Sequence, residues 1–130
     1  MPVFSSSSLE QLHSCAAPLI AVFEKAIAHI DVKIISGHRS AERQQYLYEI
    51  GRSKKKGGQS VHNRTPSDGI DWAPCPVDWN DLPRWYYYAG IIKAVGLSMG
   101  VNLRWGGDWD SDMILSDNTF NDLGHFEIRR

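Results

Sequence analysis

The chain has 130 residues, a length that fits one domain with one core over residues 1–130. Hydrophobic residues make up 42% and charged residues 22%, which is ordinary for a globular protein and excludes a disordered one. The net charge of −1 gives no basic field that would attract nucleic acid, and no apolar run could cross a bilayer. We therefore expect neither a nucleic-acid partner nor membrane insertion, and a monomeric protein.

The first half of the sequence predicts helices around one short strand. Serines at 5–8 are good N-caps for a short helix that carries Leu9 and Leu12. Pro18 fits the first turn of a second helix, whose apolar residues recur at three- and four-residue spacing. A strand over 32–35 follows. Ser40 then caps a helix that runs to about residue 50, with an apolar side made of Tyr46, Leu47 and Ile50.

The second half supplies most of the strands. Residues 51–59 form a polar, glycine-rich loop, and a strand over 69–73 is stopped by prolines. The longest helix begins at Asp81 and has one apolar stripe, composed of Leu82, Trp85, Ala89, Ile92 and Met99. Strands over 101–105 and 125–128 close the chain. This order predicts an α+β domain with a small, mostly antiparallel sheet packed with helices.

Three local features bear on where the protein works. The N-terminus lacks the basic start and apolar stretch of a secretory signal, so we expect synthesis in a cytoplasm. Two cysteines, Cys15 and Cys75, cannot define a disulfide framework, and reduced thiols are expected. The run 54–56 is three lysines beside two glycines, which favours a solvated loop. Attraction of that run to an anionic polymer such as a cell wall remains open.

Two histidines and a carboxylate, His62, Asp71 and His125, are what a mononuclear zinc site with one open position requires. Strand alternation places Glu127 on the same face as His125, where it could orient a ligand histidine. Asp122 lies close to a proposed ligand, where a general base for a water molecule would be needed. On spacing alone, polar surface or satisfied core residues are the favoured interpretation of both histidines.

Four segments resemble, in order, the motifs of the M15 metallopeptidases. They are Ser-Gly-His-Arg-Ser at 36–40 with Gln44 beyond it, Ser-Val-His-Asn-Arg-Thr-Pro-Ser-Asp-Gly-Ile-Asp-Trp-Ala-Pro at 60–74, Trp-Gly-Gly-Asp-Trp at 105–109 and Asp-Leu-Gly-His-Phe-Glu at 122–127. That family includes D-alanyl-D-alanine dipeptidases and carboxypeptidases and the phage L-alanyl-D-glutamate endopeptidases. The third segment is common in the phage branch, and the resemblance spans roughly residues 9 to 128.

The resemblance implies a hedgehog/DD-peptidase-like fold and one zinc ion per chain. It makes His62, Asp71 and His125 the metal ligands and Asp122 the catalytic base. Arg39 would be the cationic group that faces the scissile carbonyl, where negative charge builds up during hydrolysis.

Some positions depart from the family pattern or leave alternatives open. Many members separate the first histidine and the aspartate by seven residues, and here two more intervene, which makes Asp68 a rival ligand. His38 stands where an aromatic residue is usual and could contact substrate or pack. Asp108, in the Gly-Gly-Asp-Trp turn, could bind substrate or brace a ligand. Gln44 and Glu127 are further candidates for substrate contact or for support of the metal ligands.

The expected activity is hydrolysis of the L-alanyl-D-glutamate bond in the stem peptides of bacterial peptidoglycan. An enzyme of this kind would accumulate in the host cytoplasm and reach the wall after the membrane is breached. One alternative is a D-alanyl-D-alanine carboxypeptidase or dipeptidase. Another is a non-catalytic, zinc-stabilised wall-binding module, against which Asp122 and Arg39 argue because a structural site is closed.

Overall fold

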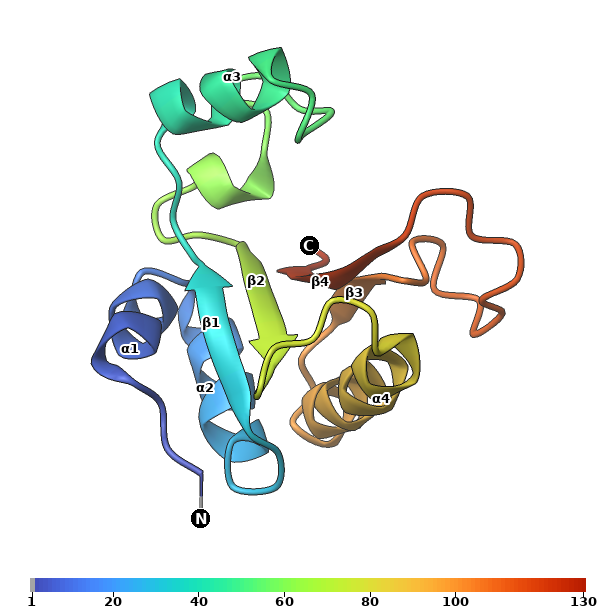
Figure 1. The fold of residues 1–130 in the computed structure, drawn as a ribbon. Coiled ribbons are helices and arrows are strands. Elements are labelled where there is room, and N and C mark those ends of the chain that lie inside the picture. The colour runs from blue at the N-terminus through green and yellow to red at the C-terminus, as the bar shows by residue number, and fades with distance from the viewer. Residues whose placement is uncertain (1) are drawn as a thin grey trace.

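A computed structural model describes residues 2–130 as helices arranged around one sheet (Figure 1). The helices are α1 (Ser6–His13), α2 (Ala17–Ala26), α3 (Ala41–Glu49) and α4 (Leu82–Ser98), with a short 3₁₀ helix η1 (Val61–Asn63). The strands are β1 (Val32–Ser36), β2 (Gly69–Pro74), β3 (Leu103–Gly106) and β4 (Asp122–Ile128). No helix of the described part is long and apolar enough to cross a membrane.

The four strands form one sheet in the order β1-β2-β4-β3, and every neighbouring pair is antiparallel. This confirms the α+β prediction with a small antiparallel sheet. The two central strands come from distant parts of the sequence, and their register places Asp71 directly opposite His125. The sheet therefore brings two proposed ligands together without any help from a loop.

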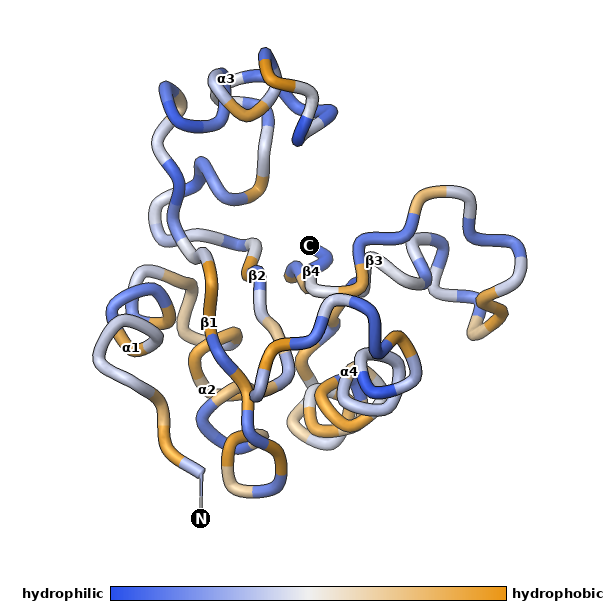
Figure 2. The backbone as a smooth tube through the Cα atoms, viewed as in Figure 1, coloured by the Kyte–Doolittle hydropathy of each residue, from blue (hydrophilic) through white to orange (hydrophobic). Residues whose placement is uncertain are grey.

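The two faces of the sheet have different environments. Ile70, Trp72 and Phe126 alternate with the polar residues of β2 and β4 and are fully buried on the helical side. There Phe126 packs edge-on against Phe23 of α2, and Trp72 contacts Trp85 of α4. Figure 2 shows hydrophobic residues recurring along β1, α2 and α4. The core thus occupies one face and leaves the other to polar side chains.

The helix starts are those that the sequence predicts. Ser5 and Ser40 are N-caps, and their hydroxyl groups accept hydrogen bonds from the backbone N–H groups of Ser8 and Arg43. Pro18 lies in the first turn of α2, and α4 begins directly after Asp81. Cys15 and Cys75 are both free, as expected.

The predicted apolar side of α3 is wrong. Tyr46 is 49% exposed and Ile50 is 47% exposed, whereas the one buried residue of the helix is Gln44. The physical reason is position, because α3 lies beyond the end of the sheet and has no core to cover (Figure 1). Leu82, placed on the stripe of α4, is likewise 49% exposed because it begins the first turn.

The bounds of the last two strands differ from the predicted 101–105 and 125–128. The strand β3 starts two residues later, at Leu103, and β4 starts three residues earlier, at Asp122.

Candidate metal centre and active site

Three donor atoms of His62, Asp71 and His125 converge on the polar face of the sheet. The Nε2 atom of His62 lies 3.2 Å from Oδ1 of Asp71 and 3.4 Å from Nδ1 of His125. The third side of the triangle, from Nδ1 of His125 to Oδ1 of Asp71, is 2.9 Å. Both histidines are buried, and Asp71 is only partly exposed.

This triangle has the dimensions of a tetrahedral zinc site. Zinc bonds to nitrogen and oxygen are about 2.0–2.2 Å long, so neighbouring ligands of a tetrahedron lie roughly 3.3 Å apart. The observed separations of 2.9–3.4 Å surround that value. Three protein ligands also leave the fourth vertex open, as a catalytic site requires. The residues present therefore fit the metal that the sequence implies.

Hydrogen bonds at the far side of each ring direct the correct nitrogen toward the triangle. Nδ1 of His62 lies 2.7 Å from the carbonyl oxygen of Gly37, which can only accept, so this nitrogen carries the proton. Nε2 of His125 lies 3.0 Å from Oε1 of Glu127, and Arg104 donates to the other oxygen of that carboxylate. When both histidines are neutral, the lone pairs on Nε2 of His62 and Nδ1 of His125 face the carboxylate of Asp71. Such an arrangement needs a cation between the three groups.

Local structure explains how His62 reaches the sheet. Residues 61–63 form η1, and Ser60 caps it through a reciprocal capping box with Asn63 that closes the turn. The ring of His62 then lies over Gly69 of β2, where any side chain would collide. A Cβ atom at Gly69 would lie 2.6 Å from Cγ2 of Val61 and 3.2 Å from Nε2 of His62. Glycine at this position makes room for the first ligand.

The charges of the triad are strongly coupled. Burial favours protonation of Asp71, but hydrogen bonds from His125 and His62 outweigh it and hold the pKa of this carboxyl well below its usual range. Burial alone would lower the pKa of His125, yet its hydrogen bonds with Asp71 and Glu127 raise it to about 9. In the metal-free protein the triad therefore holds a proton where the metal would bind.

Asp122 reaches the cleft that contains the triad because of an irregularity in the sheet. Asp122 and His125 are an odd number of residues apart, so an ideal strand would place them on opposite faces. The register between β3 and β4 shifts at this point, where Trp105 pairs with Phe126 but Gly106 pairs with Asp122. Burial raises the pKa of Asp122 above its usual range, which moves it toward the value of a useful base.

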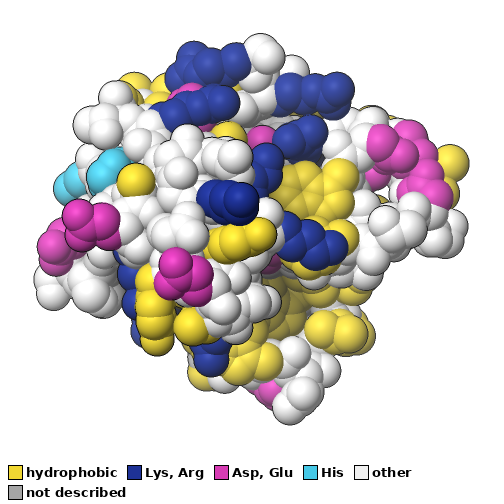
Figure 3. All heavy atoms as spheres, turned by 90° about the horizontal axis from the view of Figure 1, so that it is seen from above, with side chains coloured by type: hydrophobic (Ala, Val, Ile, Leu, Met, Phe, Trp, Pro, Cys, Tyr) yellow, Lys and Arg dark blue, Asp and Glu magenta, His cyan; other side chains and the backbone are white. Residues whose placement is uncertain are grey.

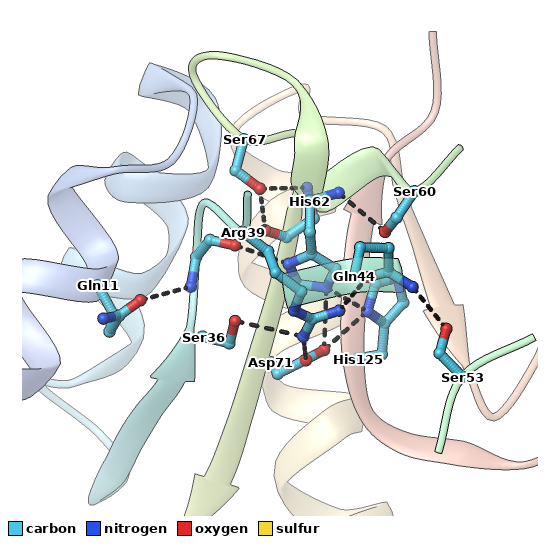
Figure 4. A network of polar contacts seen from close by, with 12 residues as sticks. Gln11, Ser36, Arg39, Gln44, Ser53, Ser60, His62, Ser67, Asp71 and His125 are labelled. Carbon is cyan, nitrogen blue, oxygen red and sulfur yellow. Dashed lines mark hydrogen bonds and ion pairs between the residues drawn. The ribbon is translucent and has the colours of Figure 1, made fainter. Parts of the chain in front are cut away.

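Arg39 is held beside the triad by a network of polar contacts (Figure 4). Its Nη2 atom donates to Oδ2 of Asp71 at 2.9 Å and to Oγ of Ser36 at 3.3 Å. Its Nη1 atom donates to Oε1 of Gln44 at 2.7 Å. A guanidinium group has five N–H donors, so donors remain for an oxygen atom in the cleft.

The triad, Asp122 and Arg39 all line one cleft of about 1210 Å³. Trp109 forms part of its wall, and the centre of its ring lies 5.7 Å from that of His125. Trp72, in contrast, is fully buried and packs against Trp85 in the core. The site is thus an open groove with aromatic and cationic walls, of a size that admits a peptide.

The sequence profile described as phage L-alanyl-D-glutamate peptidase matches residues 2–129. The chain belongs to this family. It is 28% identical over 133 aligned positions to the L-alanyl-D-glutamate peptidase of Escherichia phage T5, a match that covers 96% of each chain. It is 32% identical to the peptidoglycan L-alanyl-D-glutamate endopeptidase CwlK of Bacillus subtilis (strain 168), over 76% of this chain and 61% of CwlK.

The fold has a solved counterpart. The crystal structure of the L-Ala D-Glu endopeptidase ChiX of Serratia marcescens superposes with a TM-score of 0.77 over 98% of this chain and 90% of ChiX. Sequence identity is 21%, so this likeness shows the fold. Family membership and fold together confirm the resemblance that the four motifs carry, and they establish the chain as a peptidase of the L-alanyl-D-glutamate type.

The side chains of three other predicted site residues contact neither the triad nor Arg39. Asp68 is bound by Arg64 and Arg130 at 2.9 and 2.8 Å and does not take part in the triad. His38 is exposed, and its ring contacts Thr65 at 3.3 Å.

Asp108, in the β3–β4 loop, accepts a hydrogen bond from the backbone N–H of Met113 at 3.0 Å. Its carboxylate also approaches those of Asp110 and Asp112, a grouping that sequence analysis did not consider. The sequence does indicate this grouping, because aspartates occupy every second position over 108–112.

Proposed function

We propose that the protein is a zinc-dependent endopeptidase that hydrolyses the L-alanyl-D-glutamate bond of peptidoglycan stem peptides. The convergence of His62, Asp71 and His125 at tetrahedral spacing is the observation that supports it most strongly. The family match indicates which bond is cleaved, and the name of the relative CwlK identifies peptidoglycan as that relative's substrate.

The three triad residues would hold the metal, and the surrounding residues would divide the remaining work. When bound, zinc polarises a carbonyl group and lowers the pKa of a water molecule at its open position. Asp122, with its raised pKa, would accept a proton from the attacking water and pass it to the leaving amine. Arg39 would donate hydrogen bonds to the carbonyl oxygen as it becomes negative, in a site already fixed by Gln44 and Ser36.

Glu127 and Arg104 would act on the metal through His125. The carboxylate of Glu127 fixes the ring orientation of His125, and Arg104 holds that carboxylate at 3.0 Å.

In the lytic role that we propose, the protein is made in the host cytoplasm and acts on the wall once the inner membrane is breached. Peptide-stem hydrolysis at the D-alanyl-D-alanine end is the competing activity, and the released products distinguish the two.

The test is to digest purified peptidoglycan with zinc-loaded protein and to identify the new amino termini. We expect D-glutamate or D-isoglutamine amines from the wild type. Asp122→Asn should keep its zinc and lose about 10²–10⁴-fold in rate, the usual contribution of a general base. New termini at another bond, or wild-type lysis by the variant, would show that the proposed activity or the role of Asp122 is wrong.

A further inference from the structure

One wall of the cleft carries positive charges that the mechanism above does not use. Arg52, Lys54 and Lys55, which we call the cationic loop, follow α3, are exposed and line the same cleft as the triad. Figure 3 shows Lys and Arg side chains bordering a hydrophobic surface. The chain has a net charge of −1, so this concentration is local and does not reflect its composition.

The cationic loop differs from the other positive groups of the cleft in having no counter-ion. Arg39 pairs with Asp71, Arg104 with Glu127 and Arg64 with Asp68. Across residues 2–130, none of the three cationic-loop side chains forms an ion pair with a carboxylate. Their charge therefore remains available to a negatively charged ligand in the cleft.

The cationic loop is also anchored to the catalytic machinery. The side chain of Gln44 is fully buried, and its Nε2 atom donates to Oγ of Ser53 and to the carbonyl oxygen of Lys55, both at 2.7 Å. The other end of the same amide accepts from Arg39. Across the groove, the Nζ atom of Lys54 lies 4.3 Å from the centre of the Phe120 ring. These contacts fix the loop relative to the triad.

We infer that the cationic loop binds the free carboxylate of the D-glutamate residue that supplies the leaving amine. This inference rests on the proposed function. One carboxyl group of that glutamate continues the peptide, and the other remains charged a few bonds from the scissile nitrogen. A carboxylate so close to the metal triad falls within reach of the cleft walls, and the cationic loop offers it unpaired charge. The preferred substrates are then stem peptides whose D-glutamate is not amidated.

The test compares two soluble stem peptides that differ at one group. One carries the free D-glutamate carboxylate, and the other carries the amide, D-isoglutamine, at the same position. For the zinc-loaded wild type we expect kcat/KM to be about fivefold higher on the acid, the upper end of the range for one exposed ion pair. This ratio should shrink as salt is added, because exposed charges are screened.

Variants assign the preference to the cationic loop. In the triple variant R52Q/K54Q/K55Q the acid-to-amide ratio should fall toward one. The control is Lys56→Gln, which removes one positive charge from the next position but outside the cleft, where Nζ of Lys56 lies over the ring of Tyr48. The control should keep the wild-type ratio.

A second measurement does not depend on turnover. Titration of the D-glutamyl product peptide into zinc-loaded Asp122→Asn should give tighter binding for the acid than for the amide, and the triple substitution should abolish that difference. If the wild type cleaves both peptides equally well, or the triple variant keeps the wild-type ratio, the inference is wrong while the proposed function stands. If the wild type cleaves neither peptide, the proposed function fails and the inference falls with it.

Discussion

Asp71 and Asp68 are three positions apart on the chain, yet their surroundings give them different roles. Asp71 contacts both histidines and Arg39, whereas Asp68, directly before β2, is bound by two arginines. The sequence favours Asp71 because residues 70–74 match the strand end of the family's metal motif, but the spacing left Asp68 as a rival. Only the register with β4 distinguishes them, because it places Asp71 opposite His125.

Matched substitutions test this difference. Asp71→Asn should lower zinc affinity by at least about 100-fold, more than the usual loss for a residue that only supports a ligand. Asp68→Asn should retain zinc and lower the free energy of unfolding by about 1 kcal/mol through the loss of its arginine contacts. Zinc titration by calorimetry and urea unfolding measure the two effects. Loss of zinc from Asp68→Asn with retention in Asp71→Asn would reverse the assignment.

The raised pKa of His125 predicts how zinc binding depends on pH. Without metal its pKa is about 9, because Asp71 and Glu127 stabilise the protonated ring more than burial disfavours it. Zinc needs the neutral ring, so binding must release that proton at any pH below about 9. Zinc affinity should therefore rise about tenfold per pH unit up to this value and then level off. Affinity independent of pH between 6 and 9 would contradict the coupling.

Among the elements, η1 and β2 depend on each other through one glycine. Gly69→Ala should push the His62 ring away from the triad, because the added methyl group would lie 3.2 Å from Nε2 of His62. We expect weaker zinc binding in a protein that still folds. Gly90→Ala in α4 is the control, since nothing lies within 4 Å of its added Cβ atom. That change should stabilise the helix by up to about 1 kcal/mol and leave zinc affinity unchanged.

The elements also show where sequence reasoning succeeds and where it fails. Caps and prolines act locally, so the starts of α1, α3 and α4 could be predicted from Ser5, Ser40 and Asp81. The buried face of α3 could not, because burial depends on what packs against a helix. The register shift that turns Asp122 into the cleft is also invisible in the sequence, since it arises from pairing with β3. The candidate site was found by motif, while its geometry required the sheet.

At the scale of the whole molecule, one contiguous core joins α1, α2, α4 and the sheet. We propose that residues 1–130 fold as one domain. Urea unfolding followed by circular dichroism and by tryptophan fluorescence should then give coincident, single transitions. Free zinc at about 100 times its Kd should add about 2.7 kcal/mol to the free energy of unfolding. Two separate transitions, or no effect of zinc, would contradict this picture.

The most direct test of the account is the position of zinc in crystals of the loaded protein, located from anomalous scattering at the zinc edge. We expect one strong peak about 2.0–2.2 Å from Nε2 of His62, Nδ1 of His125 and an oxygen of Asp71, with Asp122 nearby but not coordinated. A peak at the Asp108 carboxylate group instead, or a triad whose side chains point away from each other in metal-loaded protein, would contradict the account.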